Sequence, residues 1–428
     1  MRARARVSLV SALVASALFQ GCDGSSRGAP VVGPVSEASI STGVGSAPMV
    51  ALSPHGDRAI VWISAADSGA DGRLYVSVNG ATPTAIADPL AAVEVHGEAP
   101  PKIAFASDSS LYAVYLLGKD VGKRFPVSAL RVVHSRDLGR TWSPPVTVTD
   151  DTAAFGSHNF HALAVSPDGE VYVAWLDGRA GKSAAYIANS SDGGATWGTN
   201  VRMSVGEACP CCRTALAAGT GGVIYAAWRA VLDGNVRDIV VARSGDRGHT
   251  WSEARRVHAD DWKIDGCPHA GPSLQLGEDG RLHVLWWTGK PGSAGVFYAV
   301  SADSARTFSE PVAIATQSSP SPSHVQLALA RSGTLVAAWD ELSGDMPVVR
   351  ARVALRNASF GQPVTLTDPA RASQFPAIAM HGDTAYVAWS STTTAPPHHE
   401  KMDMKEGHVG LQSVGATSVM MRQLVVKK

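Results

Sequence analysis

The sequence predicts an all-β fold, a β-propeller of four-stranded blades, and the first observation behind this prediction is a repeated octapeptide. The pattern Ser-x-Asp-x-Gly-x-Thr-Trp occurs in full at residues 135–142, 190–197 and 244–251, with a degenerate copy at 301–308. The copies begin 55, 54 and 57 residues apart. A constant period of this length is typical of folds in which each repeat is one supersecondary unit.

The second observation is a longer pattern that occurs seven times. Each copy runs from a small or apolar strand through a turn into an alternating apolar strand that ends in an aromatic residue. Alternation with β-branched and aromatic residues predicts strands rather than helices. Two further strand-like runs follow each copy, and four strands make one propeller blade. Seven blades are therefore favoured, with a six-bladed body as the alternative. The terminal aromatic residues are Trp62, Tyr115, Trp175, Trp228, Trp286, Trp339 and Trp389.

The octapeptide itself has the composition of a hairpin turn. Gly139, Gly194 and Gly248 tolerate a positive φ. The aspartate can accept hydrogen bonds from backbone N–H groups a few residues on, joined by the Ser and Thr hydroxyls. This points to a structural role. The octapeptide resembles the Asp-box, or BNR, repeat of the sialidase superfamily. That resemblance implies a propeller, and it does not by itself imply sialidase activity.

The N-terminus predicts export. Three arginines within the first six residues precede an apolar run at 7–19, followed by Gln20, Gly21 and Cys22, so residues 1–21 are expected to be a signal peptide. Residues 18–22 resemble a bacterial lipobox, with Phe19 departing from the usual pattern. This resemblance implies lipidation of Cys22 and a membrane anchor. An ordinary signal peptide followed by a stray cysteine is the alternative. Residues 22–35 are then a flexible tether, and residues 36–428 form the propeller.

Charge and length restrict the possible partners. Lys+Arg and Asp+Glu are both 37, so the chain has no electrostatic footprint for nucleic acid. No Pro/Gly-rich linker interrupts the repeats, which indicates one large domain. The expected partners are a membrane, through lipidated Cys22, and a glycan or metal ligand, with the protein itself a monomer facing the periplasm or the cell surface.

In a propeller, the loops leading into each first strand lie on the same face as those leaving each second strand. We call this face the mouth; the Asp boxes fall on the opposite rim. Four cysteines are expected at the mouth: Cys209, Cys211, Cys212 and Cys267. Disulfides are the usual state of cysteines in exported proteins, and sequence does not choose among the three pairings. Binding of copper or zinc is the second interpretation. A redox-active thiol is the third.

Histidines in neighbouring mouth loops add to the possible metal ligands. A His/Met-rich stretch near the C-terminus falls in another mouth loop, and thioether combined with imidazole favours copper. The alternative for this stretch is a solvated insertion with no ligand role. The further candidate ligands are His158, His161, His269, His324, His398, His399, Met402, Met404 and His408.

The sialidase resemblance also implies a possible glycoside hydrolase acting on terminal acidic sugars. Asp177 is the candidate acid/base, and Arg179, Arg213 and Arg229 are candidate carboxylate binders. The Arg-Ile-Pro motif of sialidases is absent, however, and no Tyr–Glu pair can be assigned. The sequence therefore favours a ligand-binding propeller, with the hydrolase as the alternative.

Overall fold

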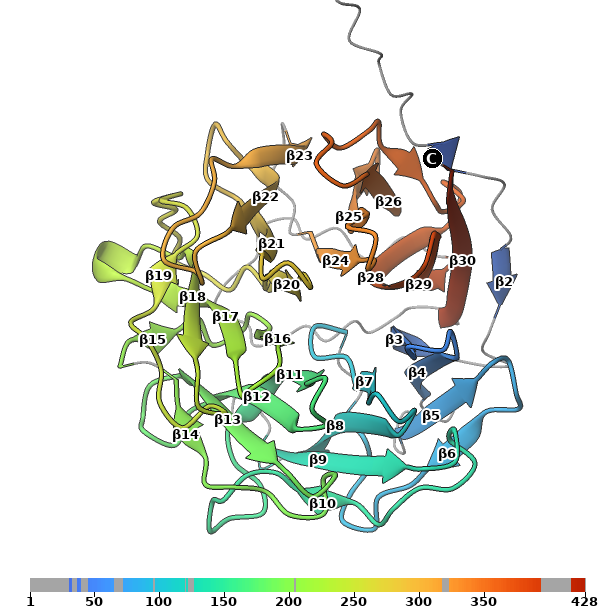
Figure 1. The fold of residues 1–428 in the computed structure, drawn as a ribbon, viewed down its shortest axis with the longest axis vertical. Coiled ribbons are helices and arrows are strands. Elements are labelled where there is room, and N and C mark those ends of the chain that lie inside the picture. Colours follow the sequence, from blue (N-terminus) through green and yellow to red (C-terminus); the bar gives the residue numbers. More distant parts are fainter. Residues whose placement is uncertain are drawn as a thin grey trace, which may run out of the picture.

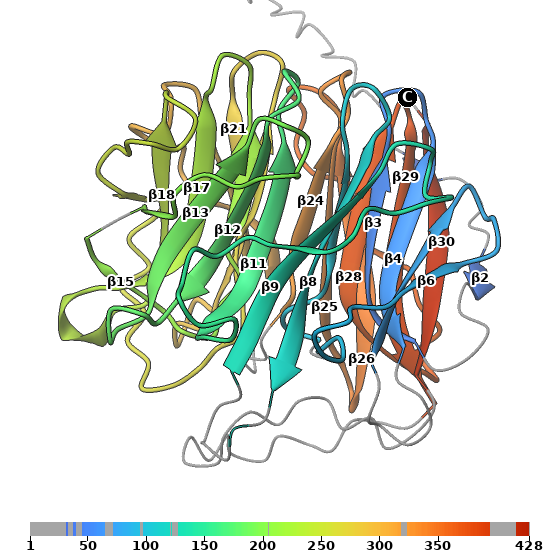
Figure 2. The ribbon, with the colours of Figure 1, turned by 90° about the horizontal axis from the view of Figure 1, so that it is seen from below.

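The protein is a seven-bladed β-propeller, in which seven antiparallel sheets surround a central axis (Figure 1). The computed structural model describes residues 31–32, 37–39, 45–64, 72–94, 97–119, 121, 127–203, 205–317, 323–393 and 417–427. The predicted fold class is confirmed, and the seven-bladed form is the correct one of the two considered. Viewed edge-on, the strands run between the two faces of the ring (Figure 2).

Each blade is a meander that starts with the innermost strand. Blade 1 contains β3 (Ser46–Leu52), β4 (Arg58–Ser64), β5 (Arg73–Val78) and β6 (Thr84–Ile86). Blade 2 contains β7 (Lys102–Phe105), β8 (Leu111–Lys119), β9 (Val127–Ser135) and β10 (Val146–Thr147). Blade 3 contains β11 (His158–Val165), β12 (Val171–Asp177), β13 (Ala184–Ser190) and β14 (Val201–Arg202).

The remaining blades follow the same order. Blade 4 contains β16 (Ala215–Ala218), β17 (Ile224–Val231), β18 (Ile239–Ser244) and β19 (Arg255–Arg256), with β15 (Glu207–Ala208) also paired to β17. Blade 5 contains β20 (Ser273–Leu276), β21 (Leu282–Thr288), β22 (Gly295–Ser301) and β23 (Val312–Thr316). Blade 6 contains β24 (Gln326–Leu329), β25 (Leu335–Ser343), β26 (Met346–Ala354) and β27 (Val364–Thr365). Blade 7 contains β28 (Ala372–His381), β29 (Thr384–Thr392) and β30 (Thr417–Lys427).

The ring closes by joining the two ends of the chain. Strand β2 (Glu37–Ser39) pairs antiparallel with β30, and β1 (Val31–Val32) pairs with the far end of the same strand. The N-terminal segment thus adds outer strands to the last blade. The innermost strand β28 also packs beside β3 of the first blade. Pairing begins at Val31, inside the range 22–35 that was expected to be a tether.

The core lies between neighbouring blades and is filled by the second strands. All seven residues of β12 are buried, because both faces of this strand are covered by adjacent blades. The seven aromatic residues that end the second strands are each at most 3% exposed. Large aromatic side chains at equivalent positions therefore fill the space between neighbouring blades, which explains their recurrence in the sequence.

The Asp boxes form the turns predicted for them. In the copy at 190–197, the Ser190 hydroxyl donates to Asp192 at 2.7 Å and accepts from the Gly194 N–H at 2.8 Å. Asp192 also accepts from the backbone N–H and hydroxyl of Thr196, and the hydroxyl bond above all lowers the pKa of this carboxyl to about 2. Gly194 has φ 85°, as expected for a residue in this turn. In the part of the chain that the structure describes, no helix has the length and apolar character needed to span a membrane.

Candidate functional site

The mouth gathers polar side chains from five blades around the propeller axis. They lie at the start of an innermost strand, just before one, or near the end of a second strand. Register shifts at the mouth ends of β3, β11 and β28 mark β-bulges, a feature that often re-aims side chains beside functional sites. The main residues are Lys102, His161, Arg213, His269, His324 and Asp340.

Four cysteines and one histidine form a cluster at this face, which we call the thiol cluster. The Sγ atom of Cys209 lies 3.6 Å from Sγ of Cys211 and 3.6 Å from Sγ of Cys212. Cys211 also groups with Cys267 and His269, with the ligand atoms of all three within 4.8 Å of one another. Within the described residues, none of these four cysteines forms a disulfide, so the structure does not support the disulfide interpretation.

Backbone contacts of the loop before β16 bring three of these thiols together. The N–H of Cys209 donates to the carbonyl of Arg229 at 2.8 Å, directly after the short pairing of β15 with β17. The chain then turns at Pro210, and the Cys212 N–H returns to the Cys209 carbonyl at 3.4 Å. This tight turn places three closely spaced cysteines on one side, where each is at most 1% exposed.

The charges around the thiol cluster favour a thiolate at Cys209. The pKa of Cys209 is lowered, because the Cys211 and Cys212 thiols hydrogen-bond to its sulfur and Arg237 adds positive charge. The Nη1 atom of Arg237 lies 3.1 Å from this sulfur. Burial raises the pKa of both Cys211 and Cys212. Cys209 is therefore the thiol of this group that most readily loses its proton.

Arg229 supports the same region rather than presenting its charge to a ligand. Its guanidinium is completely buried and donates to the backbone carbonyls of Arg237, Ala270 and Trp287. These bonds tie the mouth loop of blade 5, which carries Cys267 and His269, to the second strand of blade 4. The candidate carboxylate binder Arg229 is thus a residue that positions two mouth loops.

His324 lies between two carboxylates. Its Nδ1 atom is 2.6 Å from Asp340, and its Nε2 atom is 3.0 Å from both oxygens of Glu98. Burial alone would lower the pKa of His324, but the two carboxylates raise it to about 10. Burial alone would raise the pKa of Glu98, but His324 lowers it to about 2. Both ring nitrogens of this candidate metal ligand are therefore occupied in an ionised triad.

Arg213 and His161 lie near this triad. The carboxylates of Glu98 and Asp340 act electrostatically on Arg213, which follows Cys212 directly in the chain. His161 is fully buried on β11, and its Nε2 atom lies 3.3 Å from the Val114 carbonyl of the preceding blade. Burial, and then the charge of Lys102, lower the pKa of His161 to about 3. This histidine is consequently neutral.

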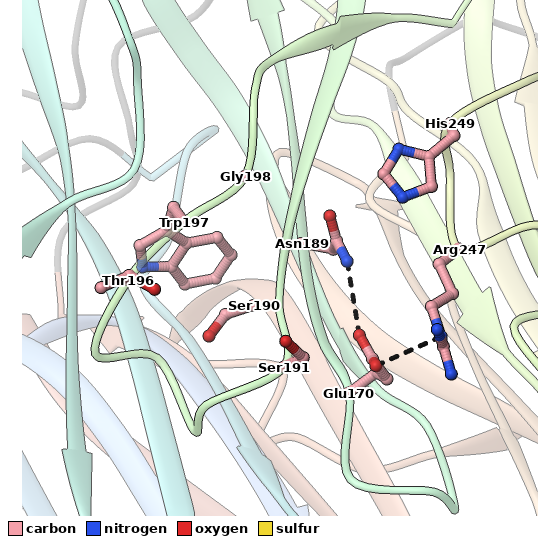
Figure 3. A pocket seen from close by; sticks show the side chains of 9 residues that line it. All are labelled: Glu170, Asn189, Ser190, Ser191, Thr196, Trp197, Gly198, Arg247 and His249. Carbon is pink, nitrogen blue, oxygen red and sulfur yellow. Dashed lines mark hydrogen bonds and ion pairs between the residues drawn. The ribbon is translucent and has the colours of Figure 1, made fainter.

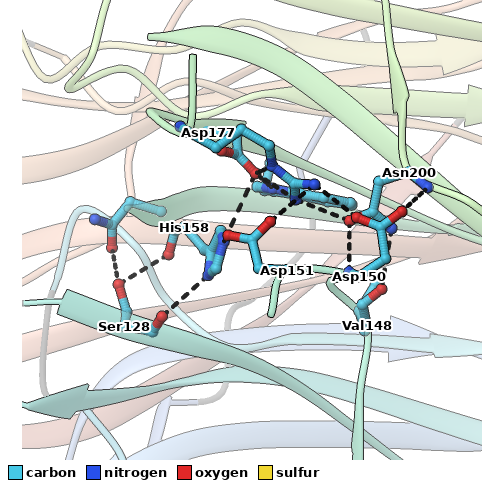
Figure 4. A network of polar contacts seen from close by, with 10 residues as sticks. Ser128, Val148, Asp150, Asp151, His158, Asp177 and Asn200 are labelled. Atoms are coloured by element: carbon cyan, nitrogen blue, oxygen red, sulfur yellow. Dashed lines mark hydrogen bonds and ion pairs between the residues drawn. The ribbon is translucent and has the colours of Figure 1, made fainter. Parts of the chain in front are cut away.

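Asp177 and Arg179 belong to a separate network at the end of β12 (Figure 4). Asp177 is 1% exposed and accepts hydrogen bonds from the Trp175 indole and from Arg179. Arg179 also lies 2.6 Å from Asp150 and 2.8 Å from Asp151. His158 lies 2.8 Å from Asp151 in the same network. The carboxylate proposed as an acid/base is therefore enclosed by its own structural partners.

The positions of three side chains in this network would also allow a cation to bind. The ligand atoms of Asp151, His158 and Asp177 lie within 4.8 Å of one another. The guanidinium of Arg179 already lies 2.8 Å from an oxygen of each of the two aspartates, so it offsets part of their negative charge without an ion. His158 is thereby placed away from the thiol cluster, to which the sequence had linked it.

Some predicted residues fall outside the described part of the chain, and others were missed. Cys22, His398, His399, Met402, Met404 and His408 lie outside the described residues. The sequence analysis did not identify Glu98, Lys102 or Arg237. Glu98 lies against His324, Lys102 acts on His161, and Arg237 lies against Cys209. A signal existed for Glu98, because it precedes an innermost strand as His324 does, but no motif letters mark it.

The opposite rim carries a groove between the Asp boxes of blades 3 and 4 (Figure 3). Its volume is about 340 Å³, and Trp197, Thr196 and His249 contribute to its lining. Its charged groups are paired with each other, with Glu170 3.3 Å from Arg247 and 3.3 Å from Asn189. The groove is shallow and polar. The thiol cluster and the ion triad of His324 lie at the mouth instead.

Comparison with known proteins supports the architecture. Residues 81–255 match the model of the BNR repeat-like domain. A search of curated proteins finds no match. The fold is similar to a crystal structure of a protein of unknown function from Dyadobacter fermentans DSM 18053, at 14% identity and a TM-score of 0.52, covering 92% of this chain and 99% of that chain.

Two carbohydrate-active proteins are also similar in structure. An ulvan lyase of a polysaccharide lyase family is 12% identical, with a TM-score of 0.54, covering 84% of this chain and 94% of that chain. A mutant of NanB sialidase from Streptococcus pneumoniae is 10% identical, with a TM-score of 0.49, covering 86% of this chain and 84% of that chain. At such identities the likeness concerns the fold alone. The fold is thus that of a seven-bladed β-propeller, and residues 81–255 within it match the BNR repeat-like domain.

Proposed function

We propose that this propeller is exported, anchored to a bacterial membrane through lipidated Cys22, and binds a soft metal ion, copper(I) or zinc, in the thiol cluster. The observation that carries the metal proposal is the convergence of Cys209, Cys211 and Cys212, joined by Cys267 and His269. Export and anchoring rest on the N-terminal sequence.

The spacing of the sulfur atoms suits metal coordination. Sulfur atoms bound to one zinc ion at about 2.3 Å in a tetrahedral arrangement are separated by roughly 3.8 Å. The two separations measured from Cys209 are 3.6 Å, close to this value. A disulfide would require about 2.05 Å between bonded sulfur atoms. The cluster therefore has the dimensions of a thiolate metal site.

The ligand types select the class of ion. Thiolate sulfur with imidazole nitrogen suits copper(I) and zinc, whereas calcium and magnesium require oxygen ligands. Cys211 belongs to both groups of three ligands, so it can serve one ion or bridge two. Arg237 offsets part of the negative charge that several thiolates would create in a buried site.

The hydrolase alternative receives less support from this geometry. A general acid must reach the substrate oxygen, whereas the oxygens of Asp177 are engaged by Trp175 and Arg179. Arg179, Arg213 and Arg229 also have three different environments, in which only Arg213 faces the polar residues at the axis.

Metal content of the purified protein tests the proposal. The full chain, purified in detergent and reduced anaerobically, is expected to take up copper(I) or zinc with a defined stoichiometry, measured by mass spectrometry of the bound metal. Cys211→Ser is expected to abolish uptake, since Cys211 is common to both ligand groups. Cys267→Ser is expected to weaken it. Ser191→Ala is the control, because Ser191 lies on the opposite rim of the propeller, and it should leave uptake unchanged.

Titration of the free thiols is the measurement that could contradict the metal proposal. If the protein, unfolded without reductant, shows no free thiols among the four mouth cysteines, they form disulfides and the metal proposal fails. Metal uptake that persists unchanged in Cys211→Ser would also reject the site.

A further inference from the structure

The N-terminal strands run along the outer side of blade 7 (Figure 1). Strand β1 pairs with the last residues of β30, with Val31 opposite Lys427, and β2 pairs nearer the middle of the same strand. Just before blade 1, the N–H of Gly45 donates to the carbonyl of Thr417, the first residue of β30, at 2.8 Å. The chain therefore enters at the end of β30 and reaches blade 1 at its start.

The two ends of β30 lie on opposite faces of the propeller. Thr417 pairs with Thr392, the last residue of the second strand β29, and second strands end at the mouth. β30 is the third strand of its blade, as β13 is of blade 3, and Ser190 ends β13 and begins an Asp box. Val31 therefore lies at the rim that carries the Asp boxes, here called the Asp-box rim.

The length of chain before β1 limits where a lipid on Cys22 can lie. Nine residue steps separate Cys22 from Val31. A chain advances at most about 3.6 Å per step, so the lipid lies within about 32 Å of Val31. β30 has 11 residues. At about 3.3 Å per residue, its mouth end is about 33 Å from its rim end. The lipid could therefore reach the level of the mouth only if the whole segment were fully extended back along blade 7.

The Asp-box rim near β1 has the polar character of a surface that rests on lipid headgroups. Two turns meet there, because a Cβ atom at Gly56 would lie 3.6 Å from the His381 ring. His55 and His381 are exposed, and Asp57 accepts hydrogen bonds from Ser53 and Asn79. Of the large hydrophobic residues that are exposed in the described part of the chain, none lies in these two turns. The rim is thus suited to contact with a bilayer surface and not to insertion.

We propose that the Asp-box rim of blade 7 faces the lipid bilayer and that the mouth, with its thiol cluster, opens into the aqueous compartment on the side away from the membrane. This inference rests on the anchoring through Cys22 proposed above, and it adds which face of the propeller meets the membrane. It also defines the class of partner for the thiol cluster. A metal ion reaches the mouth from the aqueous phase, so a water-soluble carrier supplies or removes it.

Energy transfer from two matched positions in blade 7 tests this orientation. His381 ends β28 at the Asp-box rim, Thr393 follows β29 at the mouth, and both are exposed. Full chains with His381→p-azidophenylalanine or Thr393→p-azidophenylalanine can be labelled with a donor dye without modifying a cysteine. They are added to vesicles of phosphatidylcholine and phosphatidylglycerol that carry an acceptor on the lipid headgroups. The donor at 381 is expected to lie about 25 Å closer to the acceptors than the donor at 393, the length of one strand.

A longer tether provides the control. Insertion of about 20 Gly/Ser residues between Gly28 and Ala29 extends the reach of the lipid beyond the height of the blade. The difference between the two donors is expected to fall in this variant. A difference that stays unchanged would overturn tether length as its cause.

Mass spectrometry of the N-terminal peptide separates the two ways in which the proposal can fail. If Cys22 carries no lipid, the anchoring itself is wrong and the orientation fails with it. If Cys22 is lipidated and energy transfer from position 393 equals or exceeds that from position 381, the orientation alone is overturned. The anchoring and the metal proposal would then stand.

Discussion

His324 holds Asp340 through two separate contacts at the mouth of the propeller. The Nδ1 atom of His324 lies 2.6 Å from Oδ2 of Asp340, and the backbone N–H of His324 lies 2.7 Å from Oδ1. The ring and the backbone of one residue therefore fix both oxygens of the other. This leaves Nε2 of His324 directed toward Glu98, so the segment just before blade 6 is linked to the loop before blade 2.

The first prediction concerns the pH dependence of this ion triad. The pKa of His324 is raised to about 10 from an ordinary value of 6.5, so the stability that it contributes is fully present below pH 6.5 and is lost as the pH rises through about 10. His324→Gln leaves the buried carboxylate of Asp340 and the partly exposed carboxylate of Glu98 without their cationic partner, and it is expected to cost about 3 kcal/mol near pH 6. The difference from the wild type should shrink at pH 9, as measured by urea unfolding.

The carboxylate side of the triad behaves in the opposite sense. The pKa of Glu98 is lowered to about 2 from 4.5, so its contribution is present above pH 4.5 and is lost as the pH falls through about 2. The exposed His249 provides the control, because His249→Gln should change stability little at any pH. A cost for His324→Gln that is the same at pH 6 and pH 9 would contradict the ionised triad.

The second prediction concerns the glycine of an Asp box. A Cβ atom at Gly139 would lie 2.9 Å from Cγ2 of Val78, and the residue has φ 80°. Gly169 has a similar φ of 87°, but a Cβ there would meet nothing within 4 Å. Gly169→Ala is expected to cost about 1 kcal/mol from backbone strain alone. Gly139→Ala should cost at least about 1 kcal/mol more, because a buried clash is added.

Thermal unfolding of both variants measures this difference. Equal melting temperatures for Gly139→Ala and Gly169→Ala would show that the contact of the Asp box with blade 1 is loose. In that case the turn conformation alone, and not its packing on the neighbouring blade, would account for the glycine.

The third prediction concerns Arg237 and the thiol cluster. Its guanidinium lies 3.1 Å from Sγ of Cys209 without being a metal ligand itself. Arg237→Met is expected to lower metal affinity about tenfold or more, since groups that support metal ligands commonly have effects of this size. Arg237→Lys keeps the charge and should retain most of the affinity. Competition with a chromophoric chelator measures both, and equal affinities for wild type and Arg237→Met would exclude this role.

The fourth prediction concerns Asp177. Asp177→Asn removes the charge that faces Arg179 and His158 in a buried network, and it is expected to destabilise the protein by about 3–5 kcal/mol in urea unfolding. The exposed Asp233→Asn is the control and should lie within about 0.5 kcal/mol of the wild type. Wild-type stability in Asp177→Asn, together with lost turnover of a fluorogenic sialoside that the wild type cleaves, would restore the hydrolase alternative.

Much of the fold was predictable because the determining signals are local and repeated. The aromatic residue that ends each second strand, such as Trp175, marks one blade, and the Asp box at 190–197 shows which rim is opposite the mouth. Ring closure was not predictable in the same way. The pairing of β2 with β30 joins residues almost 400 positions apart, and neither segment carries the repeat letters.

The candidate site was only partly predictable. Spacing placed Cys209, Cys211 and Cys212 in one mouth loop and Cys267 in the next, and the structure joins them through Cys211. The separation of His158 and His324 from this cluster depended on their partners, Asp151 in the loop before β11 and Glu98 in the loop before β7. Glu98 and Lys102 carry no motif, so their positions at the axis emerge only when the ring is assembled.

By itself, the sequence determined the seven-bladed propeller, the phase of its blades and the face on which the cysteines lie, because periodic burial and turn chemistry act over a few residues. Only the tertiary structure decided which charges meet. Asp177 became a structural carboxylate, and His324 became the centre of an ion triad. Such outcomes depend on distances of a few ångströms in the folded chain, because electrostatic interactions act through space and not along the sequence.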